Sequence, residues 1–272
     1  MNISFVKMHT NGNDFMIIDN RSNSLLFTAE KVASIANRKT GVGFDQLILL
    51  EDSRDFDVFM KIYNSDGKEA KMCGNASICV ASLLFASRNT LAITIETLSA
   101  SVNAALNSNG EISISIELPE QDFSELLTNN TVDKNKINFE KIHSSLIEGK
   151  LVNMGNPHIV FILKSIDDID LLKYGSRIEK NKLFTNGINT EVVEVLSKDK
   201  LKIKFWERGA GLTLSCGSGI LSAFYACYNN NLCNKKVEVL LPRGCAKVSI
   251  AKSKLTMHAI PKVSYLGEFS NE

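Results

Sequence analysis

Short runs in which apolar and polar residues alternate fill most of the first half of the chain. Such runs have the period of β-strands, and the Gly, Asn, Asp and Ser residues between them are typical of turns. Two segments place apolar residues at helical spacing instead: 29–37, with Thr28 as the expected N-cap, and 77–86. The expected strands of this half are 3–8, 15–19, 46–50, 57–63, 93–97, 101–106 and 111–118.

The second half shows the same kind of pattern. It follows a polar stretch rich in Asn, Lys and Glu, residues 119–146, which we expect to connect the two halves. One apolar helix is expected at 220–228. Each half thus has one helix that is apolar enough to be buried by the strands of its own half. The expected strands here are 150–153, 158–163, 190–196, 201–206, 237–241, 246–250 and 255–259.

An internal repeat supports this division. Two stretches of cysteine followed by glycine, at Cys73 and Cys216, lie 143 positions apart (216 − 73), each just before an apolar helix. Several pairs at one offset indicate two copies of one domain. Such copies usually pack about a pseudo-twofold axis, so we expect both cysteines to face one cleft from opposite sides. The same offset pairs Gly12-Asn13 with Gly155-Asn156, Gln46 with Asn189, and Asn64 with Glu207.

Composition narrows the classes of function. The chain has 272 residues, 44% of them hydrophobic and 22% charged, with a formal net charge of +1. This balance gives no electrostatic footprint for nucleic acid or an anionic membrane. No apolar run approaches the roughly 20 residues that span a bilayer, and the N-terminal residues lack the pattern of a signal peptide. We therefore expect a cytoplasmic protein with no nucleic-acid or membrane partner.

The cysteines indicate thiol chemistry at two positions only. No C-x-x-C pair and no zinc-ligand spacing occurs, so we expect reduced thiols and no metal. A lone cysteine is usually a small buried hydrophobe. We apply that interpretation to Cys79, Cys227, Cys233 and Cys245.

Cys73 and Cys216 differ because each directly precedes a helix. The N–H groups and positive dipole end of a helix lower a thiol pKa and bind anions such as a carboxylate. Two thiols on opposite faces of a substrate Cα can serve as proton acceptor and proton donor, as an amino-acid epimerase requires. No signature of a pyridoxal-phosphate lysine or a dinucleotide loop is evident, so no cofactor is expected.

Other polar residues have two interpretations. His158 follows Gly155-Asn156-Pro157 of the repeat and is a candidate to orient a cysteine or the substrate. Glu207 and Arg208 are either a solvated pair or substrate ligands. His9 and His258 are expected to be structural, and His143 lies in the polar connection.

The chain resembles the diaminopimelate epimerase family from Lys7 to near its C-terminus. The resemblance implies an α+β fold of two pseudo-symmetric domains, 1–118 and 119–272. Each would be a mostly antiparallel sheet or barrel around a central helix, and the last residues are candidates to pack back on the first domain. The matching stretches are Gly12-Asn13-Asp14-Phe15, Gly41-Val42-Gly43-Phe44-Asp45-Gln46, Asn64-Ser65-Asp66-Gly67, Met72-Cys73-Gly74-Asn75, Met154-Gly155-Asn156-Pro157-His158, Glu207-Arg208-Gly209-Ala210-Gly211 and Cys216-Gly217-Ser218-Gly219.

The resemblance also implies roles. Cys73 and Cys216 would be the two bases that interconvert LL- and meso-diaminopimelate without cofactor or metal, in lysine and peptidoglycan synthesis, with a homodimer as the assembly. His158 and Glu207 would position or polarise the reacting centre, beside Asn13 and Gln46. The α-carboxylate would bind the N–H groups of Gly74, Asn75, Gly217 and Ser218. The distal end of the substrate would bind Asn64, Asn156, Asn189, Glu207 and Arg208.

The sequence departs from the family pattern at three places. Ala76 and Ile78 stand where C-G-N-G-x-R-C has glycine and arginine, Leu212 replaces the acid of G-A-G-E-T, and Thr10-Asn11 precede Gly12 where the family reads G-L. None of them removes a cysteine or a distal-binding residue. Two alternatives stay open: a related racemase for another amino acid, such as histidine or hydroxyproline, and an amino-acid-binding or thiol-redox relative without the reaction.

Overall fold

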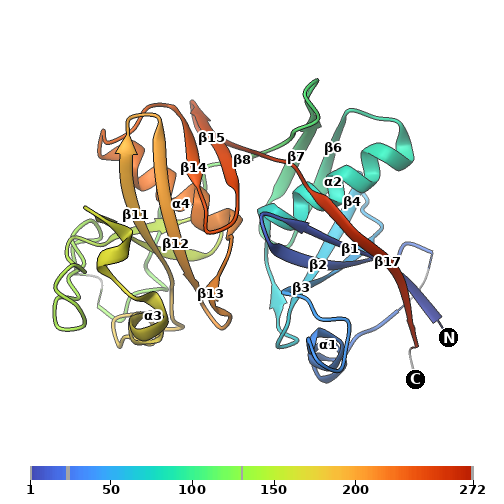
Figure 1. Ribbon diagram of the computed structural model, residues 1–272, viewed down its shortest axis with the longest axis horizontal. Coiled ribbons are helices and arrows are strands. Elements are labelled where there is room, and N and C mark those ends of the chain that lie inside the picture. Colours follow the sequence, from blue (N-terminus) through green and yellow to red (C-terminus); the bar gives the residue numbers. More distant parts are fainter. Residues whose placement is uncertain (1, 23–24, 130, 271–272) are drawn as a thin grey trace. The chain divides into compact units, whose positions relative to one another are not determined.

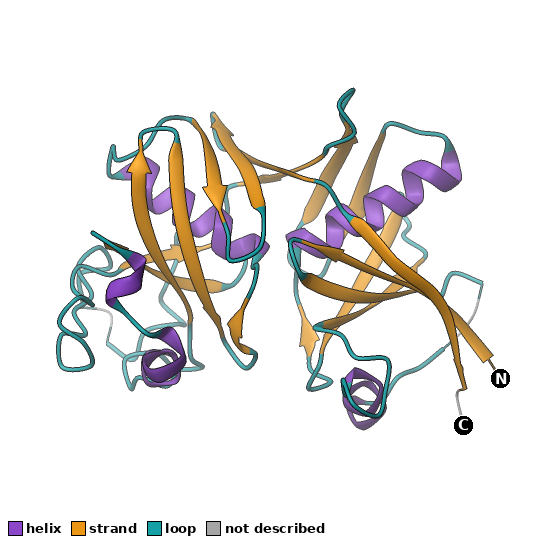
Figure 2. Cartoon of the chain, in the orientation of Figure 1, coloured by secondary structure: helices purple, strands orange, loops and turns teal. Residues whose placement is uncertain are grey.

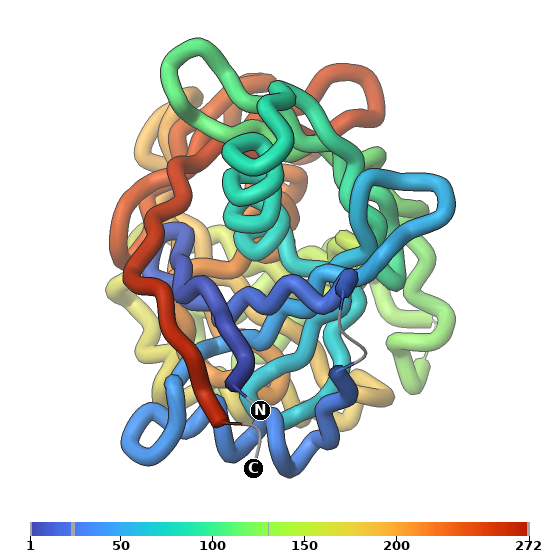
Figure 3. Tube along the Cα trace, turned by 90° about the vertical axis from the view of Figure 1, so that its right-hand side faces the viewer, coloured from blue at the N-terminus to red at the C-terminus, as the bar shows by residue number. Residues whose placement is uncertain are grey.

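The computed structural model describes residues 2–22, 25–129 and 131–270. The chain divides into two compact units (Figure 1). Unit 1 comprises Met1–Ile116 and His258–Glu272, and unit 2 comprises Glu117–Met257. Unit 1 is therefore built from both ends of the chain. The C-terminal strand lies beside the N-terminal one (Figure 3).

Unit 1 is a mostly antiparallel sheet with two helices. Its strands are β1 (Asn2–Thr10), β2 (Asn13–Asp19), β3 (Gln46–Glu51), β4 (Val58–Asn64), β5 (Glu69–Ala70), β6 (Ala92–Glu96), β7 (Ser101–Leu106), β8 (Ile112–Glu117) and β17 (Lys262–Ser270). Its helices are α1 (Ala29–Ala36) and α2 (Gly74–Arg88). β1 pairs antiparallel with both β2 and β17, whereas β2 pairs parallel with β3 and β4 parallel with β6.

Unit 2 repeats this plan (Figure 2). Its strands are β9 (Lys150–Asn153), β10 (Pro157–Leu163), β11 (Asn189–Ser197), β12 (Lys200–Glu207), β13 (Gly211–Thr213), β14 (Lys236–Leu240), β15 (Cys245–Ala251) and β16 (Lys254–Ala259), whose last two residues belong to unit 1. The helices are a 3-10 turn, η1 (Ile166–Asp168), and α3 (Leu171–Glu179) and α4 (Gly217–Asn229).

Strand pairing confirms the internal repeat. β10 pairs parallel with β11, and β12 parallel with β14, as β2 does with β3 and β4 with β6. The registers correspond as well: Phe15 is opposite Gln46, and His158 is opposite Asn189. Both pairs keep the offset of 143 (158 − 15 and 189 − 46), so the sequence offset describes two copies of one topology.

The two cysteine-led helices are the central elements of their units. α2 contacts β1, β2, β6 and β7, and α4 contacts β9 to β12. Residues 74–81 of α2 and 217–224 of α4 are all buried. A helix that is apolar all round must lie inside a core, which explains why strands surround it. Both helices begin earlier than predicted, at the glycine that follows the cysteine.

The other two helices pack on the outside of their sheets. Val32, Ile35 and Ala36 of α1 join the apolar core formed with β1, β2 and β3, and the Thr28 hydroxyl caps this helix as predicted. α3, which was not predicted, contacts β11, β12 and β13. A Cβ added at Gly175 would lie 2.2 Å from the Trp206 ring, so a glycine is needed where α3 meets β12.

The prediction that residues 119–146 only connect the halves is wrong. This segment contributes core side chains to unit 2, and Phe139 packs on the rings of Phe161 and Phe184. Its apolar residues follow no helical or strand period and stand among polar ones. Their burial could therefore not be predicted from the sequence. The buried members are Phe123, Leu127, Ile137, Phe139 and Leu146.

Two further expectations differ from the structure. Strand β17 was not predicted, and the Cys245 thiol is exposed instead of buried. Cys79, Cys227 and Cys233 are buried as predicted. No helix among the described residues is both long and apolar enough to cross a membrane.

Replacing Phe139 with alanine tests whether the polar segment belongs to the core. We expect Phe139→Ala to lower the free energy of unfolding by about 3–5 kcal/mol, because it removes a buried ring between two others. Urea denaturation followed by circular dichroism measures this. Phe56, 39% exposed, is the matched control, and Phe56→Ala should cost about 1 kcal/mol or less. Equal effects of the two substitutions would contradict the assignment.

Candidate active site

In unit 1, Cys73 is the N-cap of the central helix. Its sulfur accepts the backbone N–H of Ala76 at 3.5 Å, and its carbonyl accepts the N–H of Ser77 at 3.0 Å. The Ser77 hydroxyl donates to the same carbonyl at 2.9 Å. The thiol is partly exposed, whereas Gly74 and Asn75 in the first turn are buried. The helix thus begins at a cysteine residue that is partly exposed.

In unit 2, Cys216 caps the other central helix in the same way. Its sulfur accepts the N–H of Gly219 at 3.3 Å and lies 3.5 Å from the Ser218 hydroxyl. Here the thiol is buried. Burial raises its pKa well above the ordinary value, and the nearby carboxylates of Glu207 and Glu191 raise it further. The hydrogen bonds from Ser218 and Gly219 lower the pKa, as expected at a helix N-terminus, but burial and the two carboxylates outweigh them.

A line of amide side chains leads from the first turn of α2 to the end of the β1–β2 hairpin. Asn75 Nδ2 donates to Asn13 Oδ1 at 3.2 Å, and Asn13 Nδ2 donates to Asp45 Oδ2 at 2.9 Å. In this way the structure brings two predicted site residues together next to Cys73.

Gln46 and Asn64 form a second amide pair in unit 1. They are opposite each other on β3 and β4, and Gln46 Nε2 donates to Asn64 Oδ1 at 2.9 Å. Gln46 Oε1 is buried and accepts no hydrogen bond within the described part of the chain. A buried amide oxygen without a donor is costly, so this oxygen is suited to a ligand that brings one.

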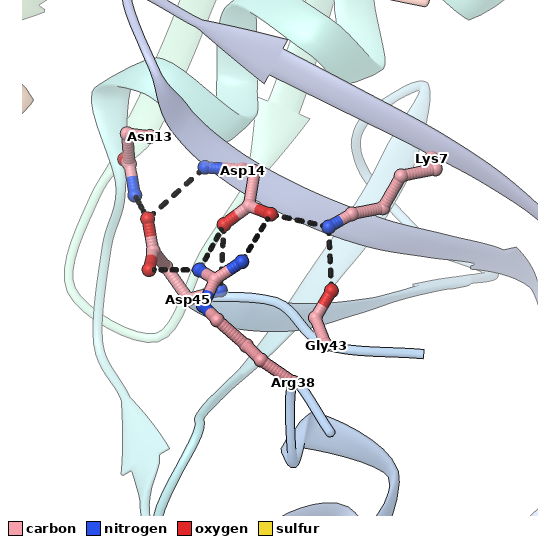
Figure 4. A network of polar contacts seen from close by, with 6 residues as sticks. All are labelled: Lys7, Asn13, Asp14, Arg38, Gly43 and Asp45. Carbon is pink, nitrogen blue, oxygen red and sulfur yellow. Dashed lines mark hydrogen bonds and ion pairs between the residues drawn. The ribbon is translucent and has the colours of Figure 1, made fainter. Parts of the chain in front are cut away.

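Charged residues anchor this half-site, and the sequence interpretation missed them (Figure 4). Arg38 donates to both Asp14, at 2.7 and 3.0 Å, and Asp45, at 2.8 Å. Lys7 bridges Asp14 and the Gly43 carbonyl. Asp45 also accepts the Asp14 backbone N–H at 3.1 Å. The guanidinium thus allows two carboxylates to lie side by side, and one of them orients Asn13.

The pKa values of the two carboxyl groups in this network shift in opposite directions. Burial alone would raise the pKa of Asp14, but the hydrogen bonds from Arg38 and Lys7 outweigh it and lower the pKa to about 2. Burial and the charge of Asp14 raise the pKa of Asp45 instead. Such splitting is expected when two carboxylates share one cation.

In unit 2, Asn189 ties together two of the predicted motifs. Its Nδ2 donates to the Pro157 carbonyl at 2.9 Å, and its Oδ1 accepts the Arg208 backbone N–H at 2.9 Å. The Arg208 side chain is exposed, and its Nη1 donates to the Asn186 carbonyl at 3.2 Å. Asn189 therefore uses its side chain to hold the loops that carry the other residues.

His158 is fully buried between two oxygen atoms. Nδ1 lies 2.8 Å from Glu191 Oε1, and Nε2 lies 2.9 Å from Asn156 Oδ1. Glu191 is another functional candidate that the sequence interpretation missed. It stands two residues after Asn189 in β11, so it shares a face of the strand with a residue that was predicted, and that period was the available signal.

The predicted site residues thus form two half-sites, each within its own unit. Unit 1 holds Asn13, Gln46, Asn64, Cys73, Gly74 and Asn75, and unit 2 holds Asn156, His158, Asn189, Glu207, Arg208, Cys216, Gly217 and Ser218. No group of three or more His, Cys, Asp or Glu residues suited to a metal was found in the described ranges.

Comparison with solved structures defines the class of fold. A phenazine biosynthesis PhzF-family protein of Enterococcus faecalis matches with a TM-score of 0.69 at 12% identity, covering 99% of this chain and 100% of that one. A probable proline racemase from Agrobacterium radiobacter matches with a TM-score of 0.67 at 12% identity, covering 99% and 93%. The chain therefore has the two-domain, pseudo-symmetric fold that these proteins share.

Sequence comparison then gives the family. The family model for diaminopimelate epimerase matches residues 5–118 and 150–265. Diaminopimelate epimerase of Zymomonas mobilis subsp. mobilis is 37% identical over 245 residues, 90% of this chain and 88% of the relative. That of Pelagibacter ubique is 34% identical over 253 residues, 92% of each. The chain belongs to the diaminopimelate epimerase family.

The Arg38 network predicts a specific response to acid. Because the pKa of Asp14 is depressed, its stabilising contribution is present above its ordinary pKa near 4 and is lost as the pH falls through about 2. In Arg38→Gln the pKa of Asp14 should rise toward its ordinary value, so this contribution should be smaller and its loss should be complete at higher pH. Carboxyl ¹³C NMR titration and urea unfolding between pH 5 and pH 2 measure both effects.

Arg88→Gln is the control for this experiment, because it removes an Arg–Asp pair with Asp57 on the surface of the same unit. It should leave the titration of Asp14 unchanged. If Asp14 titrates at the same pH in Arg38→Gln and in the wild-type protein, the guanidinium does not hold the network.

Proposed function

We propose that this protein catalyses the epimerisation of LL-2,6-diaminopimelate to meso-diaminopimelate without pyridoxal phosphate, in lysine and peptidoglycan precursor synthesis. The observation that carries the proposal is that each unit of this epimerase-family chain begins its buried central helix at a cysteine. A reaction that removes a proton from one face of Cα and returns one to the other face needs two such groups.

In the proposed mechanism, Cys73 and Cys216 act on opposite faces of the substrate Cα. One sulfur enters as thiolate and takes the α-proton, while the other enters as thiol and gives its proton to the carbanion. The raised pKa of Cys216 supports the thiol form for that residue in the resting enzyme. After one turnover the protonation states are exchanged, so the reverse reaction starts from the other sulfur.

The developing carbanion charge needs stabilisation in a closed site. Backbone N–H groups in the first turn of a helix have no partner within that helix and carry its positive dipole end. We assign the α-carboxylate to the first-turn N–H groups of Gly74, Asn75, Gly217 and Ser218. Asn13 and Gln46 would line the reacting centre, with His158 and Glu207 positioning it.

The distal amino and carboxylate groups of diaminopimelate need partners of their own. We assign them to Asn64, Asn156, Asn189, Glu207 and Arg208. The exposed side chain of Arg208 supports this role, because a guanidinium can receive a carboxylate in bidentate form. A substrate with an uncharged distal end would leave these groups unused, which favours diaminopimelate over a smaller amino acid.

We also propose that the protein works in the cytoplasm as a homodimer. β17 pairs with β1 along one edge and carries apolar side chains in solvent: Leu266 is 74% exposed and Val263 is 57% exposed. Such an edge strand is suited to pairing with a second copy. Analytical ultracentrifugation should find a dimer for the wild-type protein and a shift toward monomer for Leu266→Lys. A monomeric wild-type protein would contradict this.

Replacing either sulfur tests the two-base mechanism. We expect Cys73→Ser and Cys216→Ser each to lower epimerisation at least about 100-fold, because a hydroxyl is a far weaker acid than a thiol and cannot supply the missing base. The measurement is deuterium incorporation at Cα of diaminopimelate in heavy water, without added cofactor, by NMR and mass spectrometry.

Cys79→Ser and Cys227→Ser control for the general effect of removing a buried thiol, and they should retain exchange in protein that stays folded.

A panel of other amino acids tests which substrate the protein accepts. Full activity of either catalytic variant would overturn the mechanism, and faster exchange with an uncharged amino acid would overturn the substrate.

A further inference from the structure

The His158–Glu191 pair is the most completely buried pair of titratable side chains in the described structure, with both side chains 0% exposed. Glu191 Oε1 contacts His158 Nδ1 at 2.8 Å, while Oε2 is buried and accepts no hydrogen bond from the described residues. A buried carboxyl group with one unsatisfied oxygen lowers the stability of the fold. We therefore look for a role of Glu191 other than stabilising the fold.

The protons of this cluster can be counted. Asn156 Oδ1 can only accept, so the contact at 2.9 Å places a hydrogen on His158 Nε2. One further proton must lie between Nδ1 and Glu191 Oε1, supplied either by an imidazolium or by a carboxylic acid. In both cases Glu191 determines which imidazole nitrogen faces Asn156 as a donor, and it thereby fixes the ring.

The same carboxyl oxygen also lies against the cap of the catalytic helix. A Cβ added at Gly219 would be 2.6 Å from Glu191 Oε1, and the Gly219 N–H donates to the Cys216 sulfur at 3.3 Å. Glu191 also contributes to the raised pKa of Cys216. One side chain therefore contacts both the imidazole and the turn that holds the thiol.

Unit 1 has no counterpart of this arrangement. At the offset of 143, Phe15 corresponds to His158, Ile48 to Glu191 and Ala76 to Gly219, and the three unit 1 residues are buried and apolar. The carboxyl therefore occurs in the unit whose helix has a glycine to make room for it. The copy with isoleucine has an alanine there.

We propose that Glu191 is a positioning residue of the second half-site, which fixes the His158 ring and the first turn of α4 and so sets the position of the Cys216 thiol. The inference rests on the proposed epimerisation. In this role Glu191 acts on the reaction through its contacts with His158 and with the first turn of α4.

The test is the isosteric variant Glu191→Gln, with Glu194→Gln as the matched control. Glu194 lies three residues further along β11 and accepts the Ile166 N–H at 3.1 Å, away from the half-site. For Glu191→Gln we expect kcat to fall about 10- to 100-fold, as for a misplaced catalytic group, while KM changes less than about threefold. Glu194→Gln should keep wild-type kcat and KM.

A spectroscopic measurement separates positioning from a general loss of structure. In ¹⁵N NMR of imidazole-labelled protein, the His158 ring nitrogens should shift in Glu191→Gln and stay at their wild-type positions in Glu194→Gln. Glu191→Asp keeps the carboxyl with a shorter reach, and it should recover part of both the shift and the rate. It also keeps the test open if the amide variant folds poorly.

Two outcomes would overturn the inference: kcat of Glu191→Gln within about twofold of wild type, or unchanged His158 ring shifts in that variant. If the wild-type protein has no epimerase activity, the proposed function fails while the ring shifts still decide whether Glu191 fixes His158. Failure of the inference and failure of the function are therefore distinguishable.

Discussion

The structure depends on one interaction that occurs twice, a cysteine sulfur that accepts the backbone N–H three residues later and so starts a buried helix. Ser, Thr, Asp and Asn usually fill this position, because their oxygen atoms are better acceptors. A sulfur at the same place satisfies the N–H less well, but it puts a titratable proton at the positive end of the helix. Since 74–81 and 217–224 are buried all round, the surrounding strands hold each helix, and thus each sulfur, in place.

The two units support this common feature by different means. Unit 1 uses an exposed guanidinium, Arg38, to hold two carboxylates, and one of them, Asp45, orients Asn13 and through it Asn75. Unit 2 uses the fully buried pair of His158 and Glu191. A buried charge costs free energy unless it is paired. Each unit accordingly pairs the charged groups that lie near its cysteine. A single topology thereby gives the two thiols unlike surroundings.

The sequence predicted those features that depend on a local pattern of residues or on the internal repeat. Alternation located most strands, and the offset of 143 related Gln46 to Asn189 in positions that the strand registers confirm. The contacts of Glu191 and Arg38 could not be predicted from the sequence. These residues meet their partners through the pairing of strands and loops that are distant in sequence. Strand β17 was missed since its pairing with β1 joins the two ends of the chain. Residues 119–146 were misjudged because their buried side chains lack a period and stand among polar ones.

The central claim is that these two helix-capping sulfurs act on one carbon atom. A crystal structure with diaminopimelate bound tests it most directly, through the distance from the reacting Cα to the sulfur of Cys73 and of Cys216. The account predicts both sulfurs within about 3.5 Å of that carbon, on opposite faces, with the α-carboxylate on the first-turn N–H groups of both helices. A bound substrate with only one of the two sulfurs near Cα, or with both on the same face, would contradict it.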